Sequence, residues 1–247
     1  MSTETFTGIK LPRFDHADLI GKLIVVEGTD GVGRSTQTRE IKEWLEIKGY
    51  AVKVTGIARS PLISRVIEQA KSGHSLNVHT FSLLYLADFA DCLEHEIIPA
   101  LKAGYIVLAD RYVYTMLARG IVRGADRDWM NKCFGFALVP DAVFYLRVGI
   151  KDLIPRILNS ANLEEGYWIK STDGVMDYWE SGMDMKLGGD FYDSFVKYQK
   201  RIIREFDAMA TSFKFTTIDA SRDFETVNTR LKKHIDQILV EPPSQNL

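Results

Sequence analysis

The sequence predicts an α/β domain built on a five-stranded parallel sheet with helices on both faces. Five short runs rich in β-branched and aliphatic residues have the length of buried strands: 23–27, 51–55, 105–110, 142–148 and 213–219. A segment whose apolar residues recur at helical spacing separates each run from the next. Strands joined by helical crossovers form parallel sheets, and such sheets are covered on both faces.

The composition of the 247 residues is that of a soluble protein with a sizeable core. Hydrophobic residues make up 46%, aromatic residues 11% and charged residues 26%. The length fits one α/β domain with an insertion. The formal net charge is only −2, because 31 basic and 33 acidic residues are mixed along the chain. We therefore expect no binding to nucleic acid or to an acidic membrane.

The cysteines and the N-terminal segment predict the compartment and the boundaries. Cys92 and Cys133 lie far apart, which predicts neither a zinc site nor a disulfide framework. Residues 1–21 lack the basic start and apolar run of a signal peptide, and no stretch of about 18 uncharged apolar residues appears in the sequence. We expect a cytoplasmic protein with an N-terminal extension at 1–21, a main domain at 22–240 and a tail at 241–247.

The helical segments follow from the spacing of apolar residues. The first strand leads through a glycine-rich turn into a helix at 35–49, and the longest helical segment runs over about 78–103. Pro99 is expected to kink or break the last turn of that segment. Helical spacing fails at 159–190, so we expect an inserted loop with at most one short helix, either functional or disordered. The spacing returns at Phe191, and that helix should dock on the core.

Residues 28–35, GTDGVGRS, carry the clearest chemical signal. They fit the pattern GxxxxG[K/R][S/T] directly after a buried-type strand and before a helix, which is the context of a phosphate-binding loop, or P-loop. Glycines let successive backbone N–H groups turn inward around phosphate oxygens, and the positive end of the following helix adds attraction. The loop predicts a nucleotide site, with a tight turn that binds nothing as the alternative.

Arg34 stands where such loops usually carry lysine. Lysine reaches the phosphates as a compact point charge, whereas arginine is a wide planar fork and is not an equivalent replacement. Arginine keeps the charge, however, and a guanidinium group suits phosphate oxygens. Two interpretations stay open: a working variant, or a loop that binds nucleotide and no longer transfers phosphate.

A second chemical signal lies at the end of the third strand, in VLADRY. P-loop proteins place there a carboxylate that organises Mg²⁺, and Asp110 fits this role, while Ser35 would offer a hydroxyl to the same ion. Arg111 could clamp a phosphoryl group during transfer. The alternative for Asp110 and Arg111 is an ion pair at the end of the strand.

Four stretches together resemble the thymidylate kinase family of nucleoside monophosphate kinases: EGTDGVGRSTQ at 27–37, LEHEIIPALKAG at 93–104, DRY at 110–112 and PDAVFYLRV at 140–148. The resemblance covers roughly residues 22–238. It implies a P-loop NTPase fold with five parallel strands, ATP and Mg²⁺ as co-substrates, and transfer of the γ-phosphoryl group to dTMP. It also implies a mobile lid at the inserted loop and a homodimer.

The resemblance also implies residue roles. The nucleotide-binding residues would be Gly28, Thr29, Asp30, Gly31, Val32, Gly33, Arg34, Ser35, Thr36 and, near the adenine, Arg156. Ser35 and Asp110 would serve Mg²⁺, and Arg34, Asp110 and Arg111 would be catalytic. The acceptor side would be formed by Asp30, Arg59, Phe89 and Tyr112.

The acceptor side departs from the family pattern. The family has an Arg-Glu-Pro-Gly turn after the second strand, and here TGIARSP displaces the nearest arginine to Arg59. Phe89 stands where the family carries an arginine for the acceptor phosphate, and Gly120 where it carries a glutamine that reads thymine. The inserted loop has Lys170 and Lys186 as its only basic residues.

These departures leave three functions open. A kinase with dTMP as acceptor leads, and a P-loop kinase for a different nucleotide is the first alternative. The second alternative is a nucleotide-binding regulatory protein that has lost phosphoryl transfer. Aromatic residues of the inserted loop, among them Trp179, would either stack on a base or anchor the loop on the body.

Overall fold

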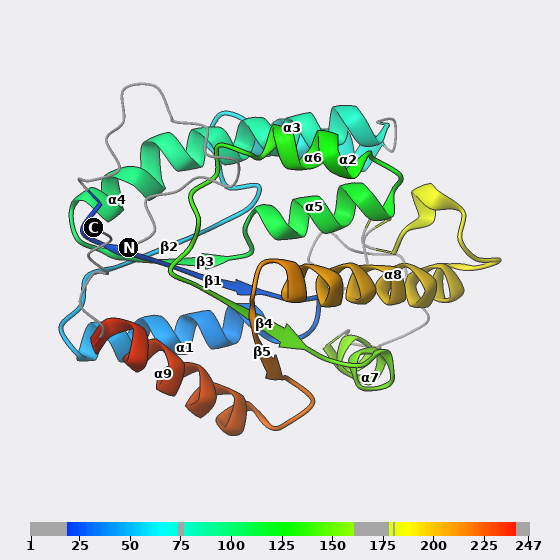
Figure 1. Ribbon diagram of the computed structural model, residues 1–247. Helices are drawn as coiled ribbons and strands as arrows, with labels where there is room; N and C mark the ends of the chain where they lie inside the picture. The colour runs from blue at the N-terminus through cyan, green and yellow to red at the C-terminus, as the bar shows by residue number, and fades with distance from the viewer. Residues whose placement is uncertain (1–18, 74–76, 161–177, 180, 241–247) are drawn as a thin grey trace.

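The computed structural model describes residues 19–73, 77–160, 178–179 and 181–240. Five strands form one sheet in the order β2-β3-β1-β4-β5, and all neighbouring strands are parallel (Figure 1). The strands are β1 Lys22–Glu27, β2 Val52–Gly56, β3 Ile106–Asp110, β4 Ala142–Arg147 and β5 Thr216–Asp219. The predicted fold class is confirmed. β5 begins at Thr216 and not at residue 213, because the Phe213 N–H still donates to the Met209 carbonyl at the end of the preceding helix.

Helices cover both faces of the sheet. They are α1 Arg34–Ile47, α2 Ser64–Gly73, α3 Val78–Cys92, α4 Ile98–Lys102, α5 Val113–Val122, α6 Arg127–Cys133, α7 Ile150–Ser160, α8 Phe191–Ser212 and α9 Phe224–Val240. In Figure 1, α1 and α9 lie on one side of the sheet, and α3, α5 and α6 lie on the other. The arrangement is the crossover architecture that alternating strands and helices predict.

The central strand β1 shows how one sequence run serves two cores. Leu23 and Val25 belong to the core with α3, α5 and α8, whereas Ile24 and Val26 belong to the core with α1, α7 and α9. Successive side chains of a strand point to opposite faces, so a strand covered on both faces must be apolar throughout. The glycine-rich loop therefore follows a strand that is buried from Leu23 to Glu27.

The predicted helical segment 78–103 is continuous but not uniform. α3 passes through a π-helical turn, η2 Leu93–Ile97, into α4. The Ile98 N–H donates to the Leu93 carbonyl, five residues earlier. Pro99 follows at once and has no N–H to donate. The irregularity expected at Pro99 thus lies in the turn immediately before it.

The described end of the insertion is packed on the body. Residues 161–177 and 180 of the predicted loop lie outside the described residues, and η3 Met183–Met185 forms a short 3-10 turn. The Trp179 ring is buried and stacks on Phe81 at 4.7 Å, and its Nε1 donates to the Lys71 carbonyl at 2.9 Å. Of the two interpretations for Trp179, the structure therefore shows the anchoring one. Docking of α8 on the core is confirmed by its buried side chains, Phe195, Tyr198, Ile202 and Phe206.

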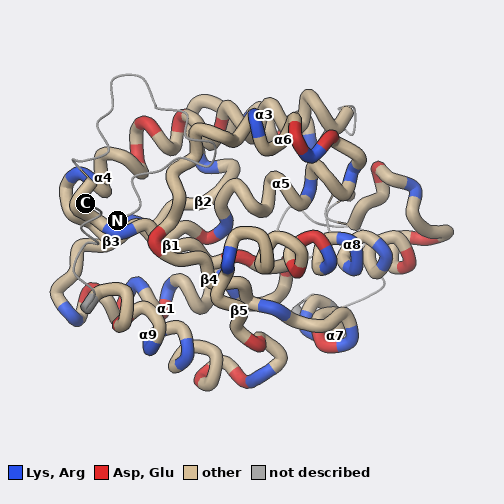
Figure 2. Tube along the Cα trace, in the orientation of Figure 1, with Lys and Arg blue, Asp and Glu red and all other residues tan. Residues whose placement is uncertain are grey.

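Charged residues of both signs are mixed along the surface helices, as Figure 2 shows for α8 and α9. Within the described ranges, no helix is long and apolar enough to cross a membrane. Of the expected extension 1–21, only residues 19–21 are described. Leu19 is buried, and the Gly21 N–H donates to the Leu101 carbonyl at 2.8 Å. The expected tail lies outside the described residues.

Candidate nucleotide site

The loop between β1 and α1 depends on its glycines. Gly28, Gly31 and Gly33 have φ angles of 152°, 75° and 95°, where side chains are strained. A Cβ on Gly28 would lie 2.8 Å from the Leu146 carbonyl, and one on Gly31 would lie 2.4 Å from Ile157 Cγ1. Gly33 precedes α1 and offers no side chain to cap its first N–H groups. These groups are placed to receive an anion.

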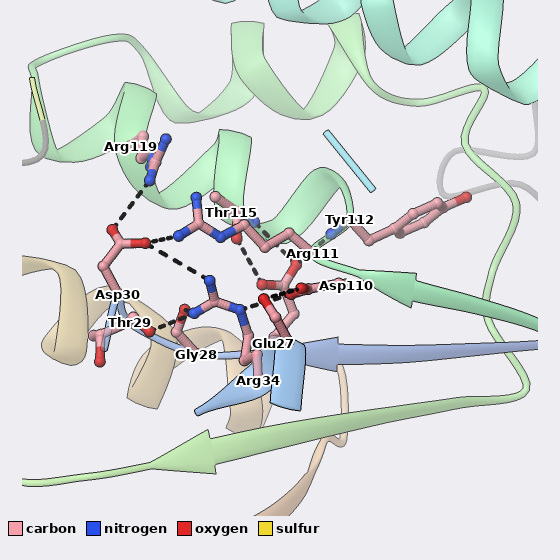
Figure 3. Close-up of polar contacts among 11 residues, drawn as sticks. Glu27, Gly28, Thr29, Asp30, Arg34, Asp110, Arg111, Tyr112, Thr115 and Arg119 are labelled. Atoms are coloured by element: carbon pink, nitrogen blue, oxygen red, sulfur yellow. Dashed lines mark hydrogen bonds and ion pairs between the residues drawn. The ribbon is translucent and has the colours of Figure 1, made fainter. Parts of the chain in front are cut away.

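The Arg34 guanidinium lies inside this loop. Its Nε donates to Asp110 Oδ1 at 3.0 Å, and its Nη1 donates to the carbonyls of Gly28, at 2.5 Å, and of Thr29 (Figure 3). Its Nη2 lies 3.6 Å from Asp30 Oδ1, and the side chain is only 7% exposed. The planar fork reaches several protein oxygens at once, which a compact ammonium group cannot do. The positive charge is thus held at the centre of the loop.

Ser35 and Asp110 come together as the sequence predicts for a magnesium site. Ser35 Oγ donates to Asp110 Oδ2 at 2.5 Å. Asp110 ends β3, whose register places it beside Val26 of β1. Mg²⁺ prefers oxygen ligands and is usually held by one or two protein oxygens together with substrate phosphates. A hydroxyl and a carboxylate oxygen beside an anion-binding loop fit that ion. The described residues hold no cluster of three or more His, Cys, Asp or Glu that would suggest a different metal.

Asp30 is the meeting point of three arginines, and Figure 3 shows its carboxylate between them. Arg111 Nη2 contacts Oδ1, Arg119 Nη2 donates to Oδ2 at 3.2 Å, and Arg34 lies near Oδ1. Arg111 has a φ of 73°, a left-handed conformation that is rare outside glycine and that clusters at functional sites. Arg119 is missing from the sequence prediction. It lies between the third and fourth predicted strands, outside the motifs on which that prediction rests.

Glu27, at the end of β1, is a second residue of the site that is missing from the prediction. Its carboxylate is fully buried and accepts hydrogen bonds from the Tyr112 N–H at 2.8 Å and from Thr115 Oγ1 at 2.6 Å. Burial raises the pKa of Glu27, and these hydrogen bonds together with the charges of Arg34 and Arg111 oppose that rise. Glu27 thus joins the end of β1 to Tyr112 and Thr115 at the start of α5, and this fixes Arg111, the residue before Tyr112.

Phe89 and Tyr112, predicted for the acceptor side, pack against each other in an aromatic cluster. Their ring centroids are 5.2 Å apart, and Phe134 and Phe136 flank Phe89. The Tyr112 hydroxyl donates to the Leu138 carbonyl at 3.0 Å, and burial raises its pKa well above the usual range. Both side chains are buried. Acceptor binding by these two residues stays a prediction.

The turn after β2 brings Arg59 to the site despite its displacement in the sequence. Arg59 Nε would lie 3.1 Å from a Cβ on Gly56, and Gly56 pairs with Asp110 in the sheet. Asp88 of α3 holds this turn by accepting from the Ala58 N–H at 2.6 Å and the Ser60 N–H at 2.8 Å. Burial raises the pKa of Asp88. The structure places Arg59 near the end of β3, and its role there stays a prediction.

Two further positions complete the comparison with the sequence. A Cβ on Gly120 would lie 2.5 Å from Met130 Cε, so the end of the Met130 side chain would have to move to admit one. Met130 of α6 thus fills the space that a glutamine at 120 would need. Arg156 of α7 donates to the Ser221 carbonyl at 3.2 Å, so it lies beside the segment between β5 and α9. Its contact with adenine stays a prediction.

A small pocket opens between the loop, α5 and α8. Its lining residues are Gly28, Thr29, Asp30, Arg111, Thr115, Arg119, Tyr198, Gln199, Ile202 and Phe206. The Thr29 hydroxyl is buried and has no hydrogen-bond partner among the described residues. A buried polar group of this kind favours a ligand with hydrogen-bonding atoms. The pocket adjoins the loop on the side of Arg111 and Arg119.

The parallel sheet, the glycine-rich loop ahead of α1 and the Ser35–Asp110 pair define the class of P-loop nucleotide-binding proteins. Residues 26–167 match the family model described as thymidylate kinase, which is more than half of the 247 residues. The chain belongs to the thymidylate kinase family.

Curated relatives resemble the chain over most of its length. It is 35% identical over 220 residues to "Probable thymidylate kinase 2" of Saccharolobus solfataricus, which covers 89% of this chain and 97% of that protein. It is 30% identical over 228 residues to "Probable thymidylate kinase" of Thermococcus kodakarensis, with 88% and 98% covered. It is 27% identical over 229 residues to "Thymidylate kinase" of Caldicellulosiruptor saccharolyticus, with 89% and 98% covered.

Proposed function

We propose that the protein transfers the γ-phosphoryl group of ATP to a nucleoside monophosphate, with dTMP as the leading acceptor. One observation carries the proposal: Arg34, Ser35 and Asp110 meet at the loop through bonds of 2.5 to 3.0 Å. Phosphoryl transfer asks for positioned charge and a metal site, and for little covalent chemistry by the protein. The family and the names of the relatives support dTMP as the acceptor.

The residues would divide the work as follows. The N–H groups of the loop and of the first turn of α1 would hold the phosphates of ATP. Ser35 and Asp110 would hold Mg²⁺, and the bound ion would neutralise part of the phosphate charge. Arg34 would keep Nε on Asp110 while its Nη groups exchange loop carbonyls for phosphate oxygens. Arg111, fixed by Glu27 through the start of α5, would face the transferred group.

A second candidate, nucleotide binding without transfer, is favoured by the packing on the acceptor side. Met130 fills the space beside Gly120, and Phe89 lies in the aromatic cluster. Under this hypothesis the loop would bind ATP and the chain would regulate a partner. The two candidates differ in a simple way, because only a kinase consumes ATP in the presence of an acceptor.

The test is the release of ADP from ATP and Mg²⁺ by purified protein, with dTMP, dUMP, CMP, UMP, GMP and AMP offered separately. A reaction without acceptor gives the background. We expect release with dTMP above all the others. Release with another monophosphate would keep the kinase and change its substrate. Background release with every acceptor, alongside clear ATP binding, would favour the second candidate.

We also propose a cytoplasmic homodimer, in which residues 22–240 form one kinase domain with a lid at 159–190. The resemblance to the family suggests the dimer, and exposed apolar side chains around α2 and α3 support it: Leu62, Val66 and Leu83. Light scattering of the purified chain tests the dimer directly, and a monomeric mass at micromolar concentration would contradict it.

A further inference from the structure

We infer that Arg119 binds the phosphate group of the acceptor nucleotide together with Arg111. The inference rests on the proposed function, because it assumes that a nucleoside monophosphate enters the pocket beside the loop. Arg119 has no counterpart among the residues that the resemblance assigns to the site. It would supply the charge that Phe89 cannot.

The first support is the geometry around Asp30. Arg111 and Arg119 each contact one oxygen of the same carboxylate, so the two guanidinium groups converge on one place. Their side chains are 13% and 10% exposed, which leaves them desolvated but reachable from the pocket. Arginine forks bind phosphate oxygens at least as well as carboxylate oxygens. A phosphate dianion could therefore take the place that the Asp30 carboxylate occupies between them.

The second support is the contrast with Arg123, one turn further along α5. Arg123 donates to Asp184 at 2.8 Å and to the Tyr198 hydroxyl at 2.6 Å, and it also reaches the Trp179 carbonyl. Its side chain is only 3% exposed, and it fixes the end of the insertion to the body. It is not among the residues that line the pocket, whereas Arg119 is. Arg123 therefore has a structural role, whereas Arg119 lines the pocket.

The third support is the charge of the pocket. Arg111 and Arg119 are its basic lining residues and Asp30 is its acidic one. The lining residues from α8 are Tyr198, Gln199, Ile202 and Phe206, and none of them is acidic or basic. The buried Thr29 hydroxyl can donate a further hydrogen bond. A ligand with a compact negative group matches this lining.

The test compares equilibrium binding of dTMP and thymidine, which differ by the phosphate. For Arg119→Met we expect dTMP affinity to fall roughly 10- to 100-fold, as for loss of a hydrogen bond to a charged group, while thymidine affinity changes little. Arg119→Lys should recover part of the loss. Arg127→Met is the matched control, because Arg127, at the start of the neighbouring helix α6, forms an exposed pair with Glu205 of α8. It should leave both affinities unchanged.

The outcomes separate this inference from the proposed function. Equal loss of dTMP and thymidine binding in Arg119→Met, with a retained melting temperature, would assign Arg119 a structural role and overturn the inference. Unchanged dTMP binding would overturn it as well. Selective loss of dTMP binding in a protein whose wild type makes no dTDP would support the inference and contradict the proposed function. A wild type that binds neither compound would contradict both.

Discussion

The proposed donor side and the proposed acceptor side of the site are built in opposite ways. On the donor side, Arg34 and Ser35 are neighbours in one loop, and both bind Asp110 at the end of the adjacent strand. On the acceptor side, Phe89 and Gly120 meet apolar partners from other helices. In such a loop, the backbone of one short segment sets the positions of the functional residues. A surface assembled from several helices can change its chemistry by single replacements.

The largest effect is expected on the donor side. Asp110→Asn should lower kcat by roughly 10³-fold or more, because it removes the carboxylate that would hold the metal and that orients Arg34. Steady-state ADP release measures the loss. The matched control is Asp141→Asn, which removes a carboxylate paired with Lys22 at the opposite end of the sheet. An equal loss in both variants would show that the effect is one of folding, and unchanged turnover in Asp110→Asn would remove the metal assignment.

The stability of the protein should depend on Arg123, which joins the end of α5 to Asp184 and to Tyr198 of α8. Arg123→Met is expected to lower the free energy of unfolding by about 3 kcal/mol, because it leaves Asp184 and the Tyr198 hydroxyl without their buried partner. Arg127→Met, at an exposed pair, should cost less than about 1 kcal/mol. Urea denaturation measures both. If Arg123→Met lowers the free energy of unfolding no more than the control does, the contacts of Arg123 with Asp184 and Tyr198 do not stabilise this part of the fold.

A smaller effect is expected at Gly120. Gly120→Gln should destabilise the protein by about 1–3 kcal/mol, because the new side chain overlaps Met130 in a packed interior. Met130 is itself buried, so Met130→Ala alone should also destabilise the protein. If the clash is the cause, the double variant should lose less than the sum of the two single losses. Thermal unfolding of wild type, the two single variants and the double variant measures this. A Gly120→Gln variant as stable as wild type would show that the acceptor side has room for the glutamine of the family.

The smallest expected effect is the pH dependence due to Glu27. Burial raises its folded pKa above 4.5, so its contribution to stability is present below about pH 4.5 and is lost as pH rises through the folded pKa. Glutamine does not titrate. The free energy of unfolding of Glu27→Gln relative to wild type should therefore rise with pH above 4.5. Urea denaturation at several pH values measures this difference, and a difference that falls with pH would reverse the assigned direction.

The same comparison explains what the sequence could predict. The strands and the loop were predictable because their signals are local: apolar runs, glycines and a helix start. Arg119 and Glu27 were missed because their partners are distant, with Asp30 lying 89 residues from Arg119 and Thr115 lying 88 residues from Glu27. The unusual residues at 89 and 120 were visible in the sequence, but not the Met130 side chain that packs beside Gly120. Only the packing of α5 against α6 reveals that neighbour.

We propose that Arg34 performs the work of the usual lysine in a functioning kinase. Single-turnover formation of dTDP from ATP and dTMP by wild type, Arg34→Lys and Arg34→Ala tests this role. We predict dTDP from wild type, a modest loss in Arg34→Lys and a loss of roughly 10²-fold or more in Arg34→Ala, because only alanine removes the charge. Equal rates for the two variants, or no dTDP from wild type, would contradict the claim.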